Sequence, residues 1–307
     1  LLTGCTGWLG TFLLAELLLQ TSATVYCLVR AESSLAGKRR IEDAAAQFGL
    51  RSLPLHRCVV MVGSLEREQL GLSAIDYNFL ANAVDAIWHN GARVDHLLGY
   101  RQLRASNVIG TVEVLRLAMH GKVKPVHFVS TYATIFSSPA LGRRVLTEDV
   151  PLPSSAAIAR GDLYANGYSQ SKCVAERLLL RASRAGLPVT IHRPARVLGS
   201  HRTGACNSDD LITRLITGII QLKSMPLLQS GGAEYGAPVD TVAAAIVALG
   251  LDAHRSSSSF GQTYHVFDPK PTSYVALFLA LGVEYLPRQT ETKKWLQEVR
   301  ESPQNVA

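Results

Sequence analysis

The sequence lacks any long uncharged apolar run. Its most apolar stretch, residues 8–20, contains Glu16 and repeats with helical periodicity, whereas a membrane-spanning helix needs about 20 apolar residues. The first residues also lack the basic segment and small-residue cleavage site of a signal peptide. The chain opens on Leu-Leu-Thr-Gly without a methionine, which suggests an excised domain. We therefore expect no contact with a membrane and a cytoplasmic location.

Metal-binding and disulfide patterns are missing as well. The five cysteines are scattered without a Cys-x-x-Cys pair, and the nine histidines form no His-x-x-x-His or carboxylate–histidine cluster. Such spacings mark zinc sites and disulfide frameworks, so we expect reduced thiols and no metal. The motif Gly-x-Ser-x-Gly is absent too, which leaves acyl hydrolysis without its nucleophile.

Nucleic-acid-binding motifs are also absent, although the net charge is +7. Aromatic residues make up only 7% of the chain, and the basic residues are dispersed. No zinc finger, aromatic ribonucleoprotein motif or basic helix occurs, so we expect no nucleic acid. The positive excess equally suits an anionic small ligand or an acidic partner.

Short apolar runs alternate with amphipathic stretches over the first two-thirds of the chain. We expect strands at residues 1–4, 23–29, 58–63, 84–92, 123–131, 188–194 and 262–269. We expect helices at residues 8–20, 35–48, 107–120, 168–180, 209–222 and 238–249. This alternation predicts an α/β fold, namely a Rossmann-type doubly wound parallel sheet with helices on both faces.

The length of 307 residues predicts one large domain with a smaller companion. We place the dinucleotide-binding domain at residues 1–198, with a return segment at about 232–268. Residues 199–231 and 269–307 would form a smaller, mainly helical C-terminal substrate-binding subdomain.

The stretch Thr-Gly-Cys-Thr-Gly-Trp-Leu-Gly, residues 3–10, lies between the first expected strand and its helix. Glycines in this position allow a tight turn, close approach of the backbone to a pyrophosphate, and close packing of helix on sheet. A merely tight turn is the alternative interpretation. The residues of this stretch that we expect to contact a dinucleotide are Thr3, Gly4, Thr6, Gly7, Trp8, Leu9 and Gly10.

Arg30 ends the second expected strand. A fold selective for NAD would place Asp or Glu there for the ribose hydroxyls, whereas an arginine suits a 2′-phosphate. Arg40, on the following helix, could approach the same phosphate, although both arginines could simply be solvated. The cofactor indicated is NADPH.

Hydroxyl and basic groups cluster near the fifth strand and the helix that follows. Ser130 and Thr131 end that strand, and either hydroxyl could stabilise a developing alkoxide. Tyr168 and Lys172 lie four residues apart and so share one helix face. We expect the Lys172 ammonium to lower the pKa of Tyr168 and make it a general acid.

The ordered set of motifs resembles the extended short-chain dehydrogenase/reductase family. It is most similar to the thioester reductase domains of nonribosomal peptide synthetases, polyketide synthases and carboxylic acid reductases. The motifs that carry the resemblance are LLTGCTGWLGTFLLAELL, VYCLVRA, HNGARVDHLLGYRQLRASNVIGTVEVLRLA, GYSQSKCVAERLL, NSDDLITRLITGIIQL and APVDTVAAAI. The resemblance implies NADPH-dependent release of an acyl or peptidyl thioester as an aldehyde, with further reduction to an alcohol in some members.

The resemblance also implies roles for individual residues. Thr131, Tyr168 and Lys172 match the catalytic set. Besides the glycine turn and the two arginines, the positions implied for cofactor binding are Ser64, Leu65, Asn90, Gly91, Ala92, Asn107, Tyr168, Lys172 and Pro194. Ser64 departs from the family, which usually has an aspartate there beside the adenine.

The partner implied by the resemblance is a phosphopantetheinyl carrier domain that presents the thioester. The chain would then be a monomeric domain of a larger multidomain protein. Two alternatives stay open. One is another extended reductase, such as a fatty acyl-CoA reductase or a sugar-nucleotide enzyme, and the other is a redox-inactive domain that cyclises the chain by Dieckmann condensation.

Overall fold

The fold is built on a seven-stranded sheet in which every pair of neighbours is parallel. The computed structural model describes residues 1–135, 147–154, 156–157, 166–226, 233–256, 259–273 and 288–302. The strand order is β11-β6-β5-β4-β1-β2-β3. These strands are β1 (Leu2–Thr3), β2 (Val25–Val29), β3 (Cys58–Val62), β4 (Ile87–His89), β5 (Val126–Val129), β6 (Val189–Pro194) and β11 (Thr263–Val266).

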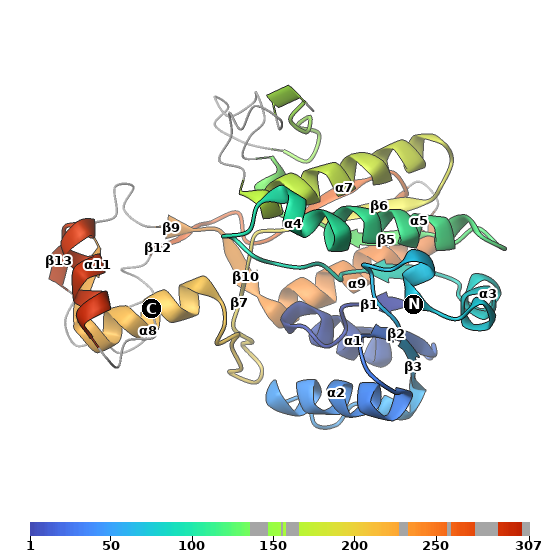
Figure 1. Cartoon of the computed structure of the whole chain (residues 1–307), viewed down its shortest axis with the longest axis horizontal. Helices are drawn as coiled ribbons and strands as arrows, with labels where there is room; N and C mark the ends of the chain where they lie inside the picture. Colours follow the sequence, from blue (N-terminus) through green and yellow to red (C-terminus); the bar gives the residue numbers. More distant parts are fainter. Residues whose placement is uncertain are drawn as a thin grey trace.

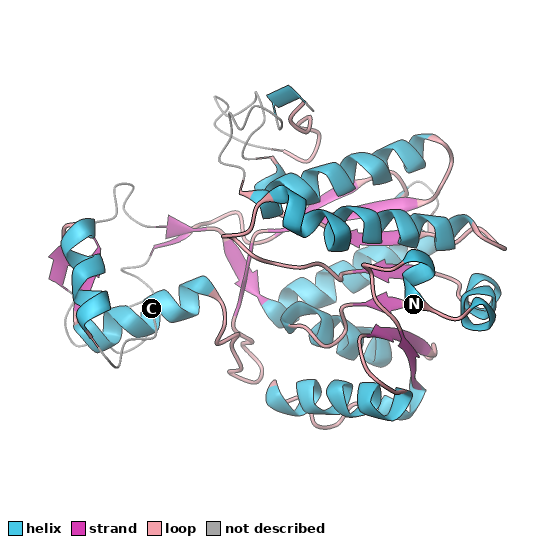
Figure 2. Cartoon of the chain, in the orientation of Figure 1, coloured by secondary structure: helices cyan, strands magenta, loops and turns pink. Residues whose placement is uncertain are grey.

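Helices cover both faces of this sheet, as Figure 1 and Figure 2 show. One face carries α1 (Trp8–Gln20), α2 (Ser34–Gln47) and α9 (Val239–Arg255). The other carries α3 (Ala74–Ala83), α5 (Gly110–Met119) and α7 (Gly167–Arg184). Each layer buries its own apolar cluster against the sheet. The predicted doubly wound architecture is confirmed.

The sequence periodicity located most of these elements. The expected helix at residues 8–20 has the bounds of α1, and all seven expected strands occur. The structure adds α3 and the short helix α4 (Tyr100–Arg104), which the sequence pattern did not indicate. These short segments mix polar and apolar residues, and helix α4 continues through a π-helical turn, Ala105–Ile109, into α5.

A smaller unit follows β6. Its helices α8 (Leu211–Leu222) and α11 (Thr292–Glu301) pack around Ile219, Met225 and Trp295. The Trp295 indole nitrogen donates to Ser224 O at 3.0 Å. The short strand pairs of this region are β7 (Arg196–Leu198) with β10 (Gly236–Pro238), β8 (Ser224–Pro226) with β13 (Arg288–Thr290), and β9 (Ala233–Glu234) with β12 (Thr272–Ser273). Much of the predicted tail at 269–307 lies outside the described residues.

The strand order reverses at β1, which has β2 on one side and β4 on the other. Chain crossovers leave this point in opposite directions, so a crevice opens beyond the carboxyl ends of β1 and β4. Dinucleotides bind at such switch points in open α/β sheets. Among the described helices, none is long and apolar enough to cross a membrane.

A chain of buried histidines runs across the sheet face that packs on α9. His127 Nδ1 and Thr190 Oγ1 are 2.8 Å apart, and Thr190 Oγ1 lies 3.0 Å from His192 Nε2. His127 Nε2 also meets His254 Nε2 of α9 at 3.0 Å. Burial lowers the pKa of His192 to about 3 and that of His127 well below its usual value. These rings are therefore neutral in the folded protein.

Neutral buried histidines make stability depend on pH. The unfolded chain protonates histidine near pH 6.5, whereas folded His192 stays neutral down to about pH 3. The unfolded state therefore binds more protons below pH 6.5, and stability is lost as the pH falls. The free energy of unfolding should drop by about 1.4 kcal/mol per pH unit for each such histidine.

Urea unfolding between pH 7.5 and 5 measures this slope. His127→Gln should make it shallower, whereas the exposed His56→Gln should leave it unchanged. Equal slopes for wild type and His127→Gln would show that His127 titrates normally in the folded protein.

Candidate active site

A cavity of about 1590 Å³ lies at the carboxyl ends of the sheet strands. It collects residues that are far apart in the sequence, from the glycine turn to Pro194. The predicted site residues that line it are Gly4, Thr6, Gly7, Trp8, Leu9, Gly10, Arg30, Arg40, Ser64, Leu65, Asn90, Gly91, Ala92, Thr131, Tyr168, Lys172 and Pro194. Thr3 and Asn107 do not line it, and both side chains are buried behind its wall.

The glycine turn requires its glycines for different reasons. Gly4 has φ +73°, and a Cβ there would lie 2.7 Å from Gly91 Cα. A Cβ on Gly10 would lie 1.8 Å from Gly4 O, so α1 can start against the turn only at a glycine. A Cβ on exposed Gly7 would meet Gly4 O at an ordinary 3.5 Å. The space beside the Gly7 Cα, at the N-terminus of α1, is thus open to an anion such as a pyrophosphate.

Behind the turn, hydrogen bonds join β1, β4 and α5. Gly91 N donates to Thr3 Oγ1 at 2.9 Å, and Thr3 Oγ1 lies 2.9 Å from His89 Nδ1. Thr111 Oγ1 donates to Asn107 O, so at 3.1 Å it accepts from His89 Nε2. Burial lowers the pKa of His89 to about 3, which keeps the ring neutral with its proton on Nε2. Thr3 therefore positions the turn from behind.

Asn107 lies on the π-helical turn before α5, a kind of turn often found at functional sites. Its Oδ1 accepts from Arg93 N at 2.7 Å, and its Nδ2 donates to Arg93 O at 3.0 Å and Ser171 Oγ at 2.9 Å. Ser171 Oγ in turn donates to Tyr168 O at 2.7 Å. Asn107 therefore links the loop after β4 to the helix that carries Tyr168.

The arginines occupy the end of the cavity near β2. Arg30 follows β2, and a guanidinium nitrogen of Arg40 donates to the Arg30 carbonyl oxygen. Both side chains are exposed and line the cavity. Ser64 and Leu65 follow β3 and form the adjoining wall, where Ser64 Oγ accepts from Glu66 N at 3.3 Å. The arginines supply positive charge at this end.

Hydroxyl groups follow β5 on the opposite side of the cavity. Thr131 caps a short 3₁₀ turn, Tyr132–Thr134, and its Oγ1 accepts from Ala133 N at 3.3 Å. No described residue accepts from the Thr131 hydroxyl, so its proton can point into the cavity. Ser130 Oγ is buried in the cavity wall and has no hydrogen-bond partner among the described residues. A bound ligand could satisfy either group.

Tyr168 and Lys172 project from one face of α7, one turn apart. Lys172 Nζ donates to Val129 O at 2.6 Å and lies 4.0 Å from the Phe128 ring centre. Burial lowers the pKa of Lys172 to about 7. Tyr168 faces the cavity, but the protein around it withdraws the phenol from bulk water and raises its pKa to about 12. The prediction that Lys172 lowers the pKa of Tyr168 is therefore wrong, because burial of the phenol raises this pKa.

A buried ion pair fixes α7 to the sheet. Arg193 of β6 meets Glu176 of α7 through two contacts, Nε–Oε1 at 2.7 Å and Nη2–Oε2 at 3.1 Å. Neighbouring Cys173 is buried and has a free thiol, and burial raises its pKa to about 12. Cys173 is thus protonated and packs in the core.

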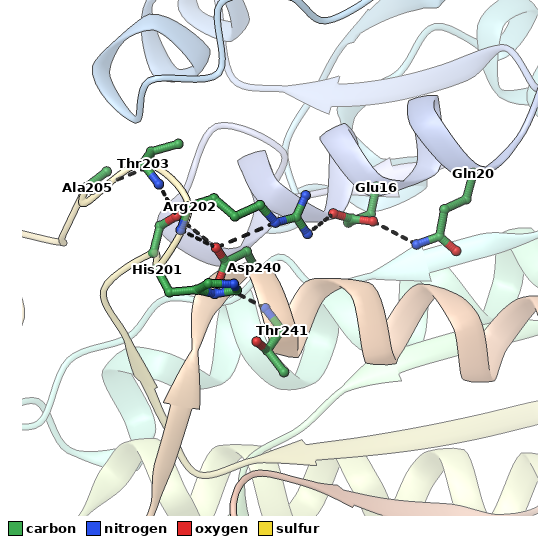
Figure 3. Close-up of polar contacts among 9 residues, drawn as sticks. Glu16, Gln20, His201, Arg202, Thr203, Ala205, Asp240 and Thr241 are labelled. Atoms are coloured by element: carbon green, nitrogen blue, oxygen red, sulfur yellow. Dashed lines mark hydrogen bonds and ion pairs between the residues drawn. The ribbon is translucent and has the colours of Figure 1, made fainter.

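The loop after β7 is held by a second polar network, shown in Figure 3. Asp240 accepts from Ser200 Oγ at 2.9 Å and Arg202 N at 3.0 Å, and it meets His201 Nδ1 at 2.9 Å. Burial would raise the pKa of Asp240, but these hydrogen bonds outweigh it and lower the pKa to about 2. Arg202 Nη2 also donates to Glu16 of α1 at 2.8 Å. The loop is thereby tied to α1 and α9.

The cavity is also lined by residues that were not predicted, among them His96, Arg196, Asp210 and Tyr235. Arg196 Nη1 and Asp210 Oδ1 are 3.5 Å apart, and Asp210 Oδ2 accepts from Ile212 N at 2.9 Å to cap α8. These residues lie in irregular segments or on short strands, where the side chains that reach the cavity have no regular spacing. No spacing rule in the sequence would have selected them.

Comparison with known proteins identifies the family. The model of a family described as "Male sterility protein", an NAD-binding family, matches residues 2–246. The chain belongs to this family. The predicted resemblance to extended short-chain dehydrogenase/reductases is confirmed, and the chain is an NAD(P)-dependent reductase of that type.

Two curated relatives and one solved structure refine this placement. The chain is 39% identical over 303 residues to a linear gramicidin synthase polypeptide of Brevibacillus parabrevis, covering 98% of this chain and 6% of that protein. It is 35% identical over 317 residues to aldehyde reductase lnaA of Aspergillus flavus, covering 99% of this chain and 30% of that protein. The chain thus spans a small part of either relative.

The solved structure is the terminal R domain from the myxalamid PKS-NRPS biosynthetic pathway. It superposes with a TM-score of 0.86 at 40% identity, covering 97% of this chain and 74% of that one. The chain is a reductase (R) domain of the type found at the end of nonribosomal peptide and polyketide synthetases.

Substitutions in the glycine turn should separate folding from cofactor binding. Gly10→Ala places a Cβ on Gly4 O, so we expect the free energy of unfolding to fall by about 1–3 kcal/mol and cofactor affinity to be lost. Gly7→Ala should keep the stability of the wild type and weaken cofactor binding at least about tenfold, because its Cβ enters the path of the pyrophosphate.

Chemical unfolding and calorimetric titration with NADPH and NADH measure the two effects. Unchanged cofactor affinity in Gly7→Ala would show that the pyrophosphate does not approach this turn.

Proposed function

We propose that the chain catalyses NADPH-dependent reductive release of a carrier-bound acyl or peptidyl thioester as an aldehyde. One observation carries the proposal. A single cavity joins the glycine turn and the arginine-lined end to Thr131, Tyr168 and Lys172. A dinucleotide bound along this path would span from the arginines to the reactive hydroxyl groups.

The residues present fit NADPH. The space beside the Gly7 Cα leaves room for a pyrophosphate, and Arg30 and Arg40 supply positive charge beyond β2 for a 2′-phosphate. The buried Ser130 hydroxyl, which has no partner within the described part of the chain, lies at the other end of the cavity. When bound, NADPH supplies the hydride.

Tyr168 and Thr131 would act on the thioester oxygen. The reduction needs a proton on this oxygen as the carbonyl carbon is reduced, and the high pKa of Tyr168 keeps its proton available at neutral pH. Thr131 Oγ1 accepts from Ala133 N, so its own proton can be donated to the same oxygen. Collapse of the resulting hemithioacetal breaks the carbon–sulfur bond and gives aldehyde and thiol.

Lys172 would support Tyr168 from behind. Its ammonium is held by Val129 O and the Phe128 ring, on the helix face that also bears Tyr168. A positive charge there stabilises the phenolate that forms when Tyr168 loses its proton. Because burial lowers the pKa of Lys172 to about 7, this support should weaken above neutral pH.

The partner we propose is a phosphopantetheinyl carrier domain of a multidomain synthetase. The long relative, the linear gramicidin synthase polypeptide, aligns with this chain over only 6% of its length, as a domain within a larger protein would. All five cysteines are free thiols, consistent with the cytoplasmic location included in the proposal.

Tyr168→Phe tests the acid role. The substitution removes only the hydroxyl, so we expect kcat to fall about 100- to 10,000-fold with cofactor affinity retained. NADPH oxidation with a pantetheine thioester, and aldehyde detection by mass spectrometry, measure it. Cys173→Ser, next to Lys172 but away from the cavity, is the matched control and should keep most of the activity. Turnover by Tyr168→Phe at the wild-type rate would contradict the role.

Arg30→Ala tests the cofactor preference. Wild type should use NADPH more than about tenfold better than NADH, and Arg30→Ala should reduce kcat/KM for NADPH about tenfold with little effect on NADH. Arg39→Ala, an exposed arginine on α2 that does not line the cavity, should leave both values unchanged. Equal use of the two cofactors by wild type would refute the role of Arg30.

A further inference from the structure

His96 lies in the loop between β4 and α4, and its ring packs against Tyr168. The ring centres are 5.8 Å apart with an interplanar angle of 78°, so the two rings meet edge to face. Both residues line the cavity. The loop is held tightly to α7, because a Cβ on Gly167 would lie 2.4 Å from Leu98 O. The position of His96 beside the reactive tyrosine is therefore fixed by backbone contact.

Asn166 determines which nitrogen of His96 carries the proton. Asn166 Oδ1 accepts from Ser169 N at 2.9 Å and Ser169 Oγ at 3.0 Å, where it caps the N-terminus of α7. Only its amide nitrogen is left to face His96 Nδ1, 3.0 Å away. An amide nitrogen can only donate, so His96 Nδ1 must accept. The neutral ring then carries its proton on Nε2.

His96 thus presents a fixed hydrogen-bond donor. The side chain is exposed and lines the cavity, and within the described part of the chain no residue accepts from Nε2. We infer that His96 donates from Nε2 to an amide carbonyl oxygen of the bound thioester substrate, close to the reacting carbonyl. This inference rests on the proposed function, and it adds a substrate-binding residue to the predicted set.

The chemistry of the site favours an amide carbonyl as the acceptor. The donor is a neutral N–H, which pairs well with a neutral oxygen. The Arg93 guanidinium also lines the cavity and would suit an anion, whereas His96 offers an uncharged donor. Amide carbonyls occur near a carrier-bound thioester in two places: the pantetheine arm and, for peptidyl chains, the residue next to the thioester. Substrates that contain one amide at a time distinguish the two.

Three octanoyl-length thioesters make this comparison. The first is the N-acetylcysteamine thioester, with an amide in the arm only. The second is a butanethiol thioester of an N-acylated amino acid, with an amide in the acyl part only, and the third is octanoyl butanethiol thioester, with neither. His96→Phe keeps a ring against Tyr168 and removes the donor. We expect the KM of His96→Phe to rise about five- to tenfold for one of the two amide-containing thioesters, which is the effect of losing one hydrogen bond. The KM for octanoyl butanethiol thioester, which has no amide, should not change.

Two matched variants complete the set. His96→Gln keeps an N–H donor near the position of Nε2 and should recover most of the affinity. Leu97→Ala changes an exposed neighbour that does not line the cavity and should match wild type. An equal rise in KM for all three thioesters, or no rise for any, would overturn the inference.

Asn166→Asp supplies a readout that a structural role would not change. The carboxylate keeps the helix cap but accepts from Nδ1, so above the histidine pKa the neutral ring loses its Nε2 proton. The charged groups near His96 on its own loop are Asp95 and Arg93, and Tyr168 faces it from α7. The variant should bind an amide-containing ligand like wild type at pH 5.5 and about five- to tenfold more weakly at pH 9. Wild type should show no such change.

A ligand that cannot be reduced separates this inference from the proposed function. The octyl thioether of N-acetylcysteamine carries the arm amide, and the octyl thioether of an N-acylated cysteine amide represents the acyl side. Calorimetric Kd values for wild type and His96→Phe report on the donor even if no thioester is turned over. Weaker binding by His96→Phe without turnover in wild type would uphold the donor and refute the reductase. Turnover in wild type with equal Kd values in both proteins would uphold the reductase and refute the donor role of His96.

Discussion

The arrangement of the reactive groups depends on one buried ion pair, between Arg193 of β6 and Glu176 of α7. Neither side chain has appreciable exposure, at 2% and 0%, and both carboxylate oxygens are engaged. Glu176 continues the helix face that bears Tyr168 and Lys172, so the pair sets how this face meets β5 and β6. Removal of one partner from such a pair leaves a buried charge and costs about 3–5 kcal/mol. The positions of Tyr168 and Lys172 therefore depend on a contact that lies outside the cavity.

The cofactor side of the cavity depends on contacts between backbones. A Cβ on Gly4 would clash with the Gly91 backbone, so the turn after β1 can meet the loop after β4 only at a glycine. Thr3 and His89 join the two strands by a hydrogen bond. Asn107 extends this connection from the loop after β4 to α7 through Arg93 and Ser171. Both ends of the cavity are thus connected through the central strands.

The sequence was sufficient to predict the sheet, most of its helices and about half of the cavity wall, because burial on both faces leaves apolar runs and the turn requires glycine. The sequence was insufficient where a property depends on how side chains are placed in three dimensions. Tyr168 and Lys172 were found by spacing, but the pKa of Tyr168 depends on surrounding atoms that spacing does not describe. Thr3 and Asn107 matched a cofactor pattern yet lie behind the wall. The donor on His96 was not apparent, because it depends on the amide orientation of Asn166, seventy residues away.

The connection between the sheet and the smaller unit is a ribbon of two parallel strands, β7 and β10, which run side by side in Figure 1. The pairing of Arg196 with Gly236 is close, since a Cβ on Gly236 would lie 2.7 Å from Arg196 O. The rotation between neighbouring strands is larger in a two-stranded ribbon than in a broad sheet. The orientation of the smaller unit beside the cavity therefore follows from the twist of this ribbon.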